Sequence, residues 1–575
     1  MPRRSAHTAV NLPGQKEMAA GRQNLPRFLL LIPPLLFLLL FYFYPLLKIF
    51  LLSFTEEVPG RGQGFRKLLQ STHYLRIFWF TFWQAAVSAV LTLILALPGA
   101  YVFARFRFPG KKLLQAFSTV PFVLPTVVVA AAFQSLLGPK GIFNQCLMRL
   151  FDLSAPPVAA DRSIYFILLA HIFYNYTVVL RIVGGFWAQL ETSAADAARM
   201  LGASPLICFR RITFPLLRPA VISAGLLVFI FCFSSFGVVL ILGGPRFATL
   251  EVEIYRQAVH LFNLPLAAAL SLIQILFTFL IMRTYTALQR SSSRALHPES
   301  PGKSRKKAFS PGEKLMVRGN ITAMVLFLGL PLLSLLLRSL FTEQGFSLIY
   351  YFSLFQNENQ SLFFVPPLYA IRNSLGFAGI SALMALLLGI PAALFLVLRK
   401  DRLTAFLDPL FMLPLSTSAV TLGFGFIVSL DRPPLNLRTS LLLLPIAHCL
   451  VAFPFVVRSL LPVLRSIPRS LRESAALLGA SPRQVWCSVD LPIIRRALLV
   501  AAVFAFTVSL GEFGASVFVA RPHTPTMPLA IYRFLGQPGH MNYGQAMAMS
   551  SLLMLVSAVS FLCIEKFRMG NTGEF

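Results

Sequence analysis

The sequence predicts an all-α membrane protein with about twelve transmembrane helices, arranged as two parallel six-helix repeats. Composition is the first observation: 56% of the 575 residues are hydrophobic, 13% are charged, and the mean hydropathy is +0.72. A soluble chain of this size could not bury so much apolar surface, because single cores stop growing and chains then split into domains. The other two observations are a series of long apolar runs and an internal repeat.

Long apolar runs place six spans in each half, each at or above the length of about 20 residues that crosses a bilayer. The first run is too long for the core of a signal peptide and has no A-x-A-like cleavage site, so we expect it to be retained. We expect the spans near 28–54, 77–104, 115–138, 162–188, 219–243 and 265–286, and then near 319–341, 370–398, 405–430, 439–465, 497–520 and 543–565.

A polar stretch at 287–318 separates the two sets of spans. It contains serines, prolines and a basic run at 303–307, a composition typical of a linker on the cytoplasmic side. We therefore expect a cytoplasmic basic tail, a first transmembrane domain, a cytoplasmic linker, a second transmembrane domain and a cytoplasmic tail, at 1–27, 28–286, 287–318, 319–566 and 567–575 respectively.

The formal net charge is +30, and the cations concentrate between the apolar runs. The positive-inside rule explains this pattern better than nucleic-acid binding does, so we expect contact with the lipid bilayer and no nucleic-acid partner. The rule places both termini and the linker in the cytoplasm, and the protein in the inner (cytoplasmic) membrane. The six cysteines are scattered without metal-ligand spacing, and we expect neither a disulfide nor a metal site.

The two halves repeat each other at an offset of 277 residues, which pairs His171 with His448 and the segment 201–205 with 478–482. Both segments read Leu-Gly-Ala-Ser-Pro, and the match continues over roughly 85 residues without an insertion. Two repeats of six spans have the same orientation in the membrane. This implies a pseudo-twofold axis along the membrane normal, with a pathway between the halves.

Each repeat contains a predicted helical hairpin between two spans. In the first repeat, Ser193 and Asp196 form a capping box that begins a short helix, and Gly202 suits the left-handed position that ends it. Ser204 and Pro205 then begin a second helix. The second repeat carries the same signals at 470–482.

The hairpins resemble the EAA loop of ABC importer permeases, which carries a coupling helix that docks into the nucleotide-binding subunit. Asp196 stands where that family usually has Glu, and Ser474 replaces the middle Ala. Capping alone is the alternative role for the two carboxylates. The resemblance implies ATPase-docking residues Asp196, Ala197, Ala198, Gly202 and Pro215 in the first repeat, and Glu473, Ser474, Ala475, Gly479 and Pro492 in the second.

The resemblance implies a transport permease and not an enzyme. Two equivalent hairpins imply two copies of an ABC ATPase subunit on the cytoplasmic face, and the family implies an extracytoplasmic solute-binding protein. The stretch 297–304 ends in Gly-Lys-Ser but lacks the first glycine of a phosphate-binding loop. We therefore expect this chain to bind no cofactor, with ATP and Mg used by the partner ATPase.

Glu512 is the strongest candidate for lining the translocation pathway, because ionisable residues inside a membrane are costly and mark function by default. Its counterpart across the repeat is Ser235, so the pathway should be asymmetric and suited to a cationic or hydrogen-bond-donating solute. The alternative is a glutamate paired with Arg521 or Arg533.

An aromatic stretch of Tyr174, Asn175 and Tyr176 is a second candidate for the pathway, since its rings could stack on a ring-bearing solute. Aromatic-rich spans are, however, more often simply packed. His171 and His448 occur at matched places in both halves, which favours a structural role such as a buried hydrogen-bond network.

Segments toward the end of each half resemble thiamine-importer permeases. They are 231–237, 242–244, 249–251 and 254–255 in the first half, and 509–514, 527–528, 531–532 and 564–566 in the second. Those permeases carry an acid-Phe-Gly sequence where 512–514 stands. The resemblance implies uptake of thiamine or its phosphate esters by alternating access. Fused ferric-iron permeases share the architecture and are the alternative. An ion-coupled secondary transporter is the alternative from another class, and it would not need paired hairpins.

Overall fold

The computed structural model describes residues 28–54, 65, 68, 70–158, 162–190, 193–244, 246–292, 306–307, 310–342, 344–356, 365–398, 401–431, 433 and 435–568. The predicted tail 1–27 lies outside these residues, as do residues 293–305 and 308–309 of the predicted linker and residues 569–575 of the C-terminal tail. The described residues form helices and four strands of two residues each.

The elements of the first half are α2 (Ile32–Leu38), η1 (Leu39–Phe43), α3 (Tyr44–Ser53), α5 (Thr72–Arg105), β1 (Phe106–Arg107), α6 (Lys111–Val123), α7 (Thr126–Leu137), α8 (Ile142–Phe151), α9 (Ile164–Gln189), α10 (Ser193–Met200), α11 (Pro205–Cys208), η2 (Phe209–Thr213), α12 (Phe214–Phe233), α13 (Gly237–Leu242), α14 (Leu250–Tyr255), η3 (Arg256–His260) and α15 (Leu264–Ser292).

The elements that follow are β2 (Lys306–Lys307), α16 (Pro311–Leu340), β3 (Phe341–Thr342), β4 (Gly345–Phe346), α17 (Ile349–Phe352), η4 (Ser353–Phe355), α18 (Leu368–Leu398), α19 (Arg402–Ser416), α20 (Ala419–Ser429), α21 (Leu443–Ser466), α22 (Arg469–Leu477), α23 (Pro482–Val485), η5 (Trp486–Asp490), α24 (Leu491–Gly511), α25 (Ser516–Val519), α26 (Met527–Leu535) and α27 (His540–Arg568). β1 pairs with β2 in parallel, and β3 pairs with β4 antiparallel.

The described residues contain eleven helices that are long and apolar enough to cross a membrane. The count is twelve if α19 and α20, which bend by 93° at a short break, form one span. This confirms the predicted all-α fold with about twelve transmembrane helices.

Four spans predicted as continuous are interrupted in the structure. The span predicted at 115–138 breaks between α6 and α7, and the one at 405–430 breaks between α19 and α20. The spans at 219–243 and 497–520 break between α12 and α13 and between α24 and α25. Hydropathy does not reveal these breaks, because the residues around them are themselves mostly apolar.

Local backbone chemistry explains where the chain leaves the helix. Leu124 is extended, with a ψ of 141°, because the ring of Pro125 disfavours the helical conformation of the residue before it. Thr417 is extended with a ψ of 134°, and the side chain of Ser418 then caps α20 by accepting from the N–H of Val420. Glu512 is extended with a ψ of 121° at the end of α24.

The first helices of each half pack against the other half. α2 lies against α18 and α3 against α20, while α16 lies against α5 and α7 as well as α27. One core of buried apolar side chains therefore contains residues of both halves, such as Phe173 and Phe513. The halves are interlocked and not merely joined by a linker.

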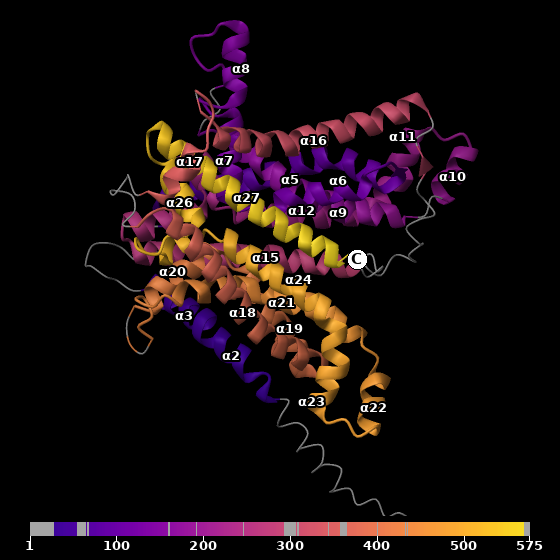
Figure 1. Ribbon diagram of the computed structural model, residues 1–575. Coiled ribbons are helices and arrows are strands. Elements are labelled where there is room, and N and C mark those ends of the chain that lie inside the picture. Colours follow the sequence, from indigo (N-terminus) through magenta and orange to yellow (C-terminus); the bar gives the residue numbers. More distant parts are fainter. Residues whose placement is uncertain are drawn as a thin grey trace, which may run out of the picture.

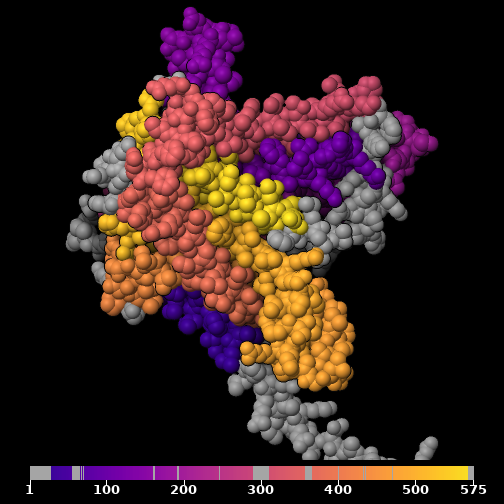
Figure 2. Space-filling view, in the orientation of Figure 1, coloured from indigo at the N-terminus to yellow at the C-terminus, as the bar shows by residue number. Residues whose placement is uncertain are grey.

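The hairpins α10–α11 and α22–α23 lie at the separate ends of two helical bundles, which come together near α17 and α26 (Figure 1). At the end opposite the hairpins, α8 projects from the body as a separate knob (Figure 2). The arrangement gives the molecule one end where the halves meet and one end that carries two distant hairpins.

Candidate translocation pathway and docking hairpins

The first hairpin turns through a left-handed glycine. Gly202 has a φ of +87°, and its N–H donates to the carbonyl of Arg199 at 2.9 Å. The N–H of Ala203 donates to the carbonyl of Ala198 at 3.0 Å. These two bonds form a Schellman motif, which closes the end of a helix and fixes the direction of the following chain.

The second hairpin repeats this turn. Gly479 has a φ of +85°, and its N–H donates to the carbonyl of Ala476 at 3.0 Å. The N–H of Ala480 donates to Ala475 at the same distance. The predicted left-handed glycines are therefore confirmed at both positions.

The hydroxyl groups of Ser204 and Ser481 cap the second helix of each hairpin, as predicted. Ser481 also forms a capping box with Gln484, whose side chain accepts from the Ser481 N–H at 2.8 Å. The capping box predicted at Ser470 is wrong, because α22 begins at Arg469 with Pro468 as the preceding residue and no side-chain cap. The extended backbone of Pro468 starts the helix before Ser470 is reached.

The structure places all ten predicted docking residues at half-exposed or exposed positions. Asp196 forms an ion pair with Arg199 at 3.6 Å on the surface of α10, and Glu473 is exposed on α22. Pro215 and Pro492 begin the long helices α12 and α24 directly after the π-helical turns η2 and η5. Each hairpin is thus connected rigidly to a transmembrane helix.

Four apolar side chains at the hairpin tips were missed by the sequence analysis. Met200, Leu201, Leu477 and Leu478 each expose 89% of their surface. They are two matched pairs, since 200 and 477, and 201 and 478, differ by the repeat offset. Such exposed apolar pairs are typical of a surface that a partner covers. The signal was present as two large apolar residues before each turn glycine.

Ser235 and Glu512 lie at equivalent breaks in α12–α13 and α24–α25. Both side chains are buried. The Glu512 carboxylate accepts hydrogen bonds from the N–H of Ala515 at 3.0 Å and the N–H of Ser516 at 3.1 Å. It lies 3.4 Å from Nε2 of His448. The carboxylate therefore organises the break and is not paired with Arg521 or Arg533.

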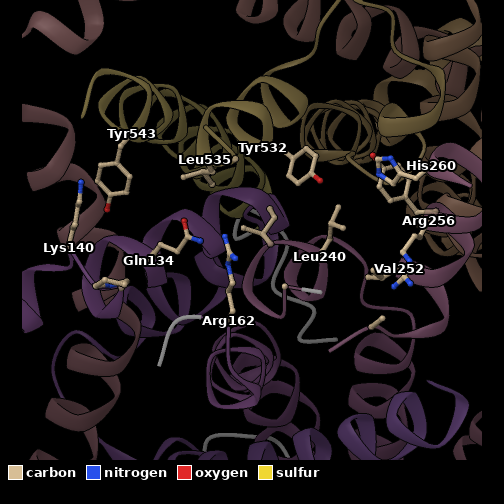
Figure 3. A pocket seen from close by; sticks show the side chains of 17 residues that line it. Gln134, Lys140, Arg162, Leu240, Val252, Arg256, His260, Tyr532, Leu535 and Tyr543 are labelled. Atoms are coloured by element: carbon tan, nitrogen blue, oxygen red, sulfur yellow. The ribbon is translucent and has the colours of Figure 1, made fainter. Parts of the chain in front are cut away.

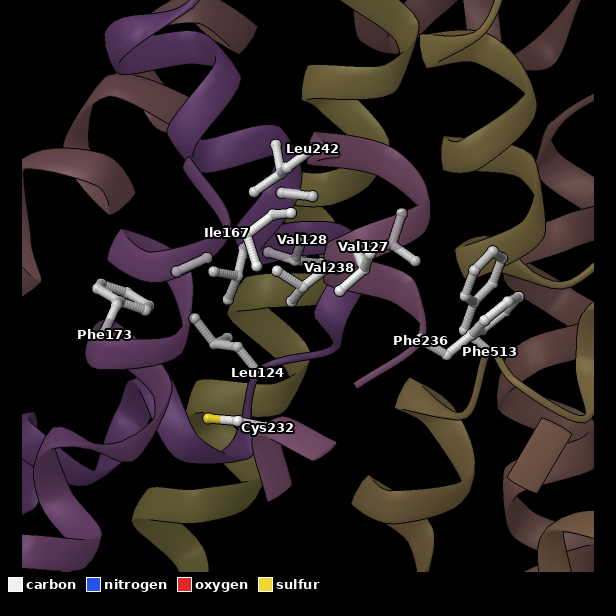
Figure 4. Packing of buried hydrophobic residues seen from close by; sticks show 14 of the residues in the cluster. Leu124, Val127, Val128, Ile167, Phe173, Cys232, Phe236, Val238, Leu242 and Phe513 are labelled. Carbon is white, nitrogen blue, oxygen red and sulfur yellow. The ribbon is translucent and has the colours of Figure 1, made fainter. Parts of the chain in front are cut away.

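A cluster of aromatic rings lies on the repeat axis beside Glu512. Phe236 and Phe513, which are equivalent residues, stack with ring centroids 5.5 Å apart (Figure 4). The equivalent tyrosines Tyr255 and Tyr532 contact this pair, at 5.6 Å and 5.4 Å. Phe518 packs against Tyr255 at 5.6 Å. We call these five residues the aromatic cluster, and its ring contacts join the two halves.

Tyr255 and Tyr532 of the aromatic cluster line a cavity of about 810 Å³, which we call the interface cavity. Both halves line it, including η3 from the first half and α26 and α27 from the second. Its titratable lining consists of cations, histidine and tyrosines. The polar residues that line it are Gln134, Lys140, Arg162, Tyr255, Arg256, His260, Tyr532 and Tyr543, and all of them except Tyr255 are labelled in Figure 3.

Two segments of the chain, 96–294 and 385–567, match the family model of the binding-protein-dependent transport system inner membrane component. One segment falls in each half. The chain belongs to this family. It is the permease subunit of an ABC importer, a non-catalytic multi-pass protein of the inner membrane, and it works with an ATPase and a periplasmic binding protein.

Curated relatives are similar along most of the permease. The thiamine transport system permease protein ThiP of Brucella abortus is 27% identical over 83% of this chain and 85% of its own length. The protein of that name from Haemophilus influenzae is 25% identical over 92% of this chain and 94% of its own. A solved bacterial ABC transporter involved in alginate import covers 49% of this chain and 99% of its own, with 16% identity and a TM-score of 0.39.

Glycines allow the breaks of the permease to pack closely. A Cβ atom on Gly237 would lie 2.3 Å from Oγ1 of Thr126, at the start of α7. A Cβ atom on the equivalent Gly514 would lie 3.1 Å from Cβ of Ala419, at the start of α20. In both halves the glycine thus lets one broken span contact another.

Glu251 on α14 is a second buried carboxylate of the permease, which the sequence analysis did not select. It accepts a hydrogen bond from Oγ of Ser418 at 2.6 Å, which joins the first half to the second. Gln274 also donates to it. In the sequence, α14 lies between two candidate membrane spans and belongs to neither. Burial raises the pKa of the Glu251 carboxyl to about 8, and Glu512 makes a smaller contribution in the same direction.

The other pathway candidates lie inside the first half. Tyr174 donates to the carbonyl of Leu124 at the α6–α7 break, and Asn175 donates to the carbonyl of His171 at 2.9 Å. Tyr176 is buried against Gly99. None of the three lines the interface cavity, and their role in the pathway stays a prediction.

The matched histidines are buried and hydrogen-bonded. His448 contacts Ser509 at 2.8 Å and Ser516 at 2.9 Å, while His171 contacts Ser88 at 2.9 Å. This geometry fits the structural role expected of residues present in both halves. The network around His448 also includes Glu512 and is therefore the more polar of the two.

Proposed function

We propose that this permease imports thiamine or its phosphate esters. The observation that carries the proposal is that aromatic rings and charged groups occur together along the interface between the halves. Tyrosine rings and cations line the interface cavity, and two of these tyrosines contact the stacked rings of Phe236 and Phe513. The buried carboxylates Glu251 and Glu512 interact with each other but do not line the cavity. Thiamine is a cation with two aromatic rings, and its esters add a phosphate.

The names of the relatives support the same solute. Two thiamine permeases align along 83% and 92% of the chain, so the similarity includes both halves. Both of these relatives are named for thiamine and neither for iron, so they favour thiamine over the ferric-iron alternative. The paired hairpins favour an ATP-driven importer over an ion-coupled transporter.

The two hairpins each engage one copy of the ATPase, which uses ATP and Mg, while this chain binds no cofactor. Their tips present similar surfaces, since a pair of exposed apolar side chains precedes each turn glycine. Both termini and the linker lie on the hairpin side of the membrane, in the cytoplasm, and the interface cavity faces the binding protein. The ten docking residues and Glu512, Ser235, Tyr174, Asn175 and Tyr176 remain the proposed sites.

The test is uptake by the complete transporter. The full-length permease would be reconstituted in vesicles with the ATPase and binding protein of the same organism, and ATP-dependent entry of labelled thiamine would be measured. Unlabelled thiamine diphosphate should compete, and ferric citrate should not. Entry of labelled iron without entry of thiamine would contradict the proposal.

A further inference from the structure

A second cavity, of about 820 Å³, lies beneath the first hairpin. We call it the hairpin cavity. Its walls are mainly apolar and come from α5, α9, α10, α11, η2 and α12, with Leu97, Trp187, Phe209 and Leu217 among them. Ile94 on the transmembrane helix α5 forms part of its rim and exposes 59% of its surface. The cavity therefore borders the lipid-facing surface of the permease.

Comparison of the two repeats explains why this cavity lies beneath the first hairpin and not beneath the second. Ala195 and Thr213 line it, and their equivalents at an offset of 277 residues are Arg472 and Asp490. Those two side chains form an ion pair at 2.8 Å between Nε and Oδ1, which ties α22 to η5. The first hairpin has two small residues where the second has this brace.

The space beside the second hairpin differs in size and chemistry. It measures about 560 Å³ and is lined by Asp401, Asp408, Arg465 and Arg472. The space contains charged side chains of both signs, and Arg465 lies 3.8 Å from Asp408. An apolar ligand would not be favoured in it.

The charge at the edge of the hairpin cavity selects a ligand class. Arg105, at the end of α5, has a buried Nη1 atom without a hydrogen-bond partner among the described residues. Arg199 is already paired with Asp196. Two arginines and one aspartate leave the lining with one excess positive charge. A buried guanidinium N–H without a partner is costly, and a phosphate oxygen would satisfy it.

We propose that the hairpin cavity binds one anionic phospholipid from the membrane leaflet on the hairpin side. Its phosphate accepts from Arg105, and an acyl chain lies against Trp187. Such a lipid occupies the place that the Arg472–Asp490 ion pair takes in the second hairpin. It braces the first hairpin against the transmembrane helices, so one docking element is held by protein and the other by lipid.

Trp187 provides the probe for a test. The chain has four tryptophans, so Trp79→Phe, Trp83→Phe and Trp486→Phe leave only the residue in the cavity. The full-length protein in detergent would be titrated with phosphatidylglycerol that carries brominated acyl chains, which quench a tryptophan at contact. We expect saturable quenching, at lower concentrations than with brominated phosphatidylcholine, and no competition by inorganic phosphate.

Two variants and one control decide the outcome. Arg105→Gln should raise the half-saturating concentration about tenfold, as expected for the loss of a charged hydrogen bond. The double change Ala195→Arg with Thr213→Asp installs the brace of the second hairpin and should abolish saturable quenching. Arg402→Gln, an exposed arginine of the second half, should change nothing.

Equal quenching by the two lipids, or an unchanged half-point in Arg105→Gln, would overturn the proposal. If phosphate competes, the cavity is a site for free anions and not for a lipid. Arg105→Gln removes the charge but keeps a polar side chain and adds no bulk to the cavity, so it decides the matter even where the double variant fails to fold. The measurement needs neither ATP nor solute and is independent of the proposed thiamine transport.

Discussion

The apolar tips of the hairpins should supply much of the affinity for the ATPase. Leu201 and Leu478 are each 89% exposed, so nearly the whole side chain is available for burial by a partner. Full burial of a leucine contributes about 1.5–3 kcal/mol, and about 2 kcal/mol corresponds to roughly a 30-fold change in Kd. Leu201→Ser and Leu478→Ser should each weaken ATPase binding by about this factor.

The two losses should add, because the hairpins lie far apart and contact separate ATPase copies. The double variant is then expected to bind about 1,000-fold more weakly per complex, which surface-immobilised permease and soluble ATPase can measure. Leu150→Ser is the matched control, since Leu150 on α8 is 75% exposed at the opposite end of the molecule. Unaltered binding in the double variant would refute docking through the tips, and a loss confined to one single variant would refute two equivalent contacts.

Three further predictions concern the interface between the halves. Gly514→Val should lower the melting temperature and impair uptake, because its added atoms meet Ala419, whereas Gly376→Val is the control with nothing within 4 Å of its Cβ. Glu512→Gln should destabilise the permease by about 1.5–3 kcal/mol, because it removes charged hydrogen bonds from two backbone N–H groups. Denaturation monitored by fluorescence would measure the loss of stability. An unchanged unfolding midpoint would contradict the prediction. Arg162→Gln should reduce uptake of thiamine diphosphate several-fold more than uptake of thiamine, because a charged contact to phosphate is lost. Arg149→Gln on α8 is the control. Equal reduction for both solutes would argue against phosphate recognition in the interface cavity.

Local signals made the hairpins predictable from the sequence. A glycine that must adopt a positive φ, followed by a capping serine and a proline, specifies the turn without help from distant residues. The one local error, at Ser470, arose because Pro468 begins the helix earlier. The number of spans was also predictable from local sequence, because the thickness of the bilayer sets the length of apolar run that a span needs.

Non-local features were not predictable in this way. Apolar patterning does not indicate that α16 packs against α5 and α7 of the other half, since every lipid-compatible surface looks alike in sequence. The role of Glu251 depends on a hydrogen bond to Ser418, which is 167 residues away. The interface cavity likewise combines residues from 134 to 543, which no spacing rule brings together.

The repeat separates what the two halves must share from what they need not share. Residues on the pseudo-twofold axis, such as Phe236 with Phe513 and Tyr255 with Tyr532, are chemically paired across the halves. Away from the axis the halves diverge, with Ser235 opposite Glu512. A solute on the axis contacts both halves, but an asymmetric solute needs different partners on its two sides. Closure can therefore be symmetric while recognition is not, and substitutions at paired positions should affect transport of every solute, whereas those at unpaired positions should change its selectivity.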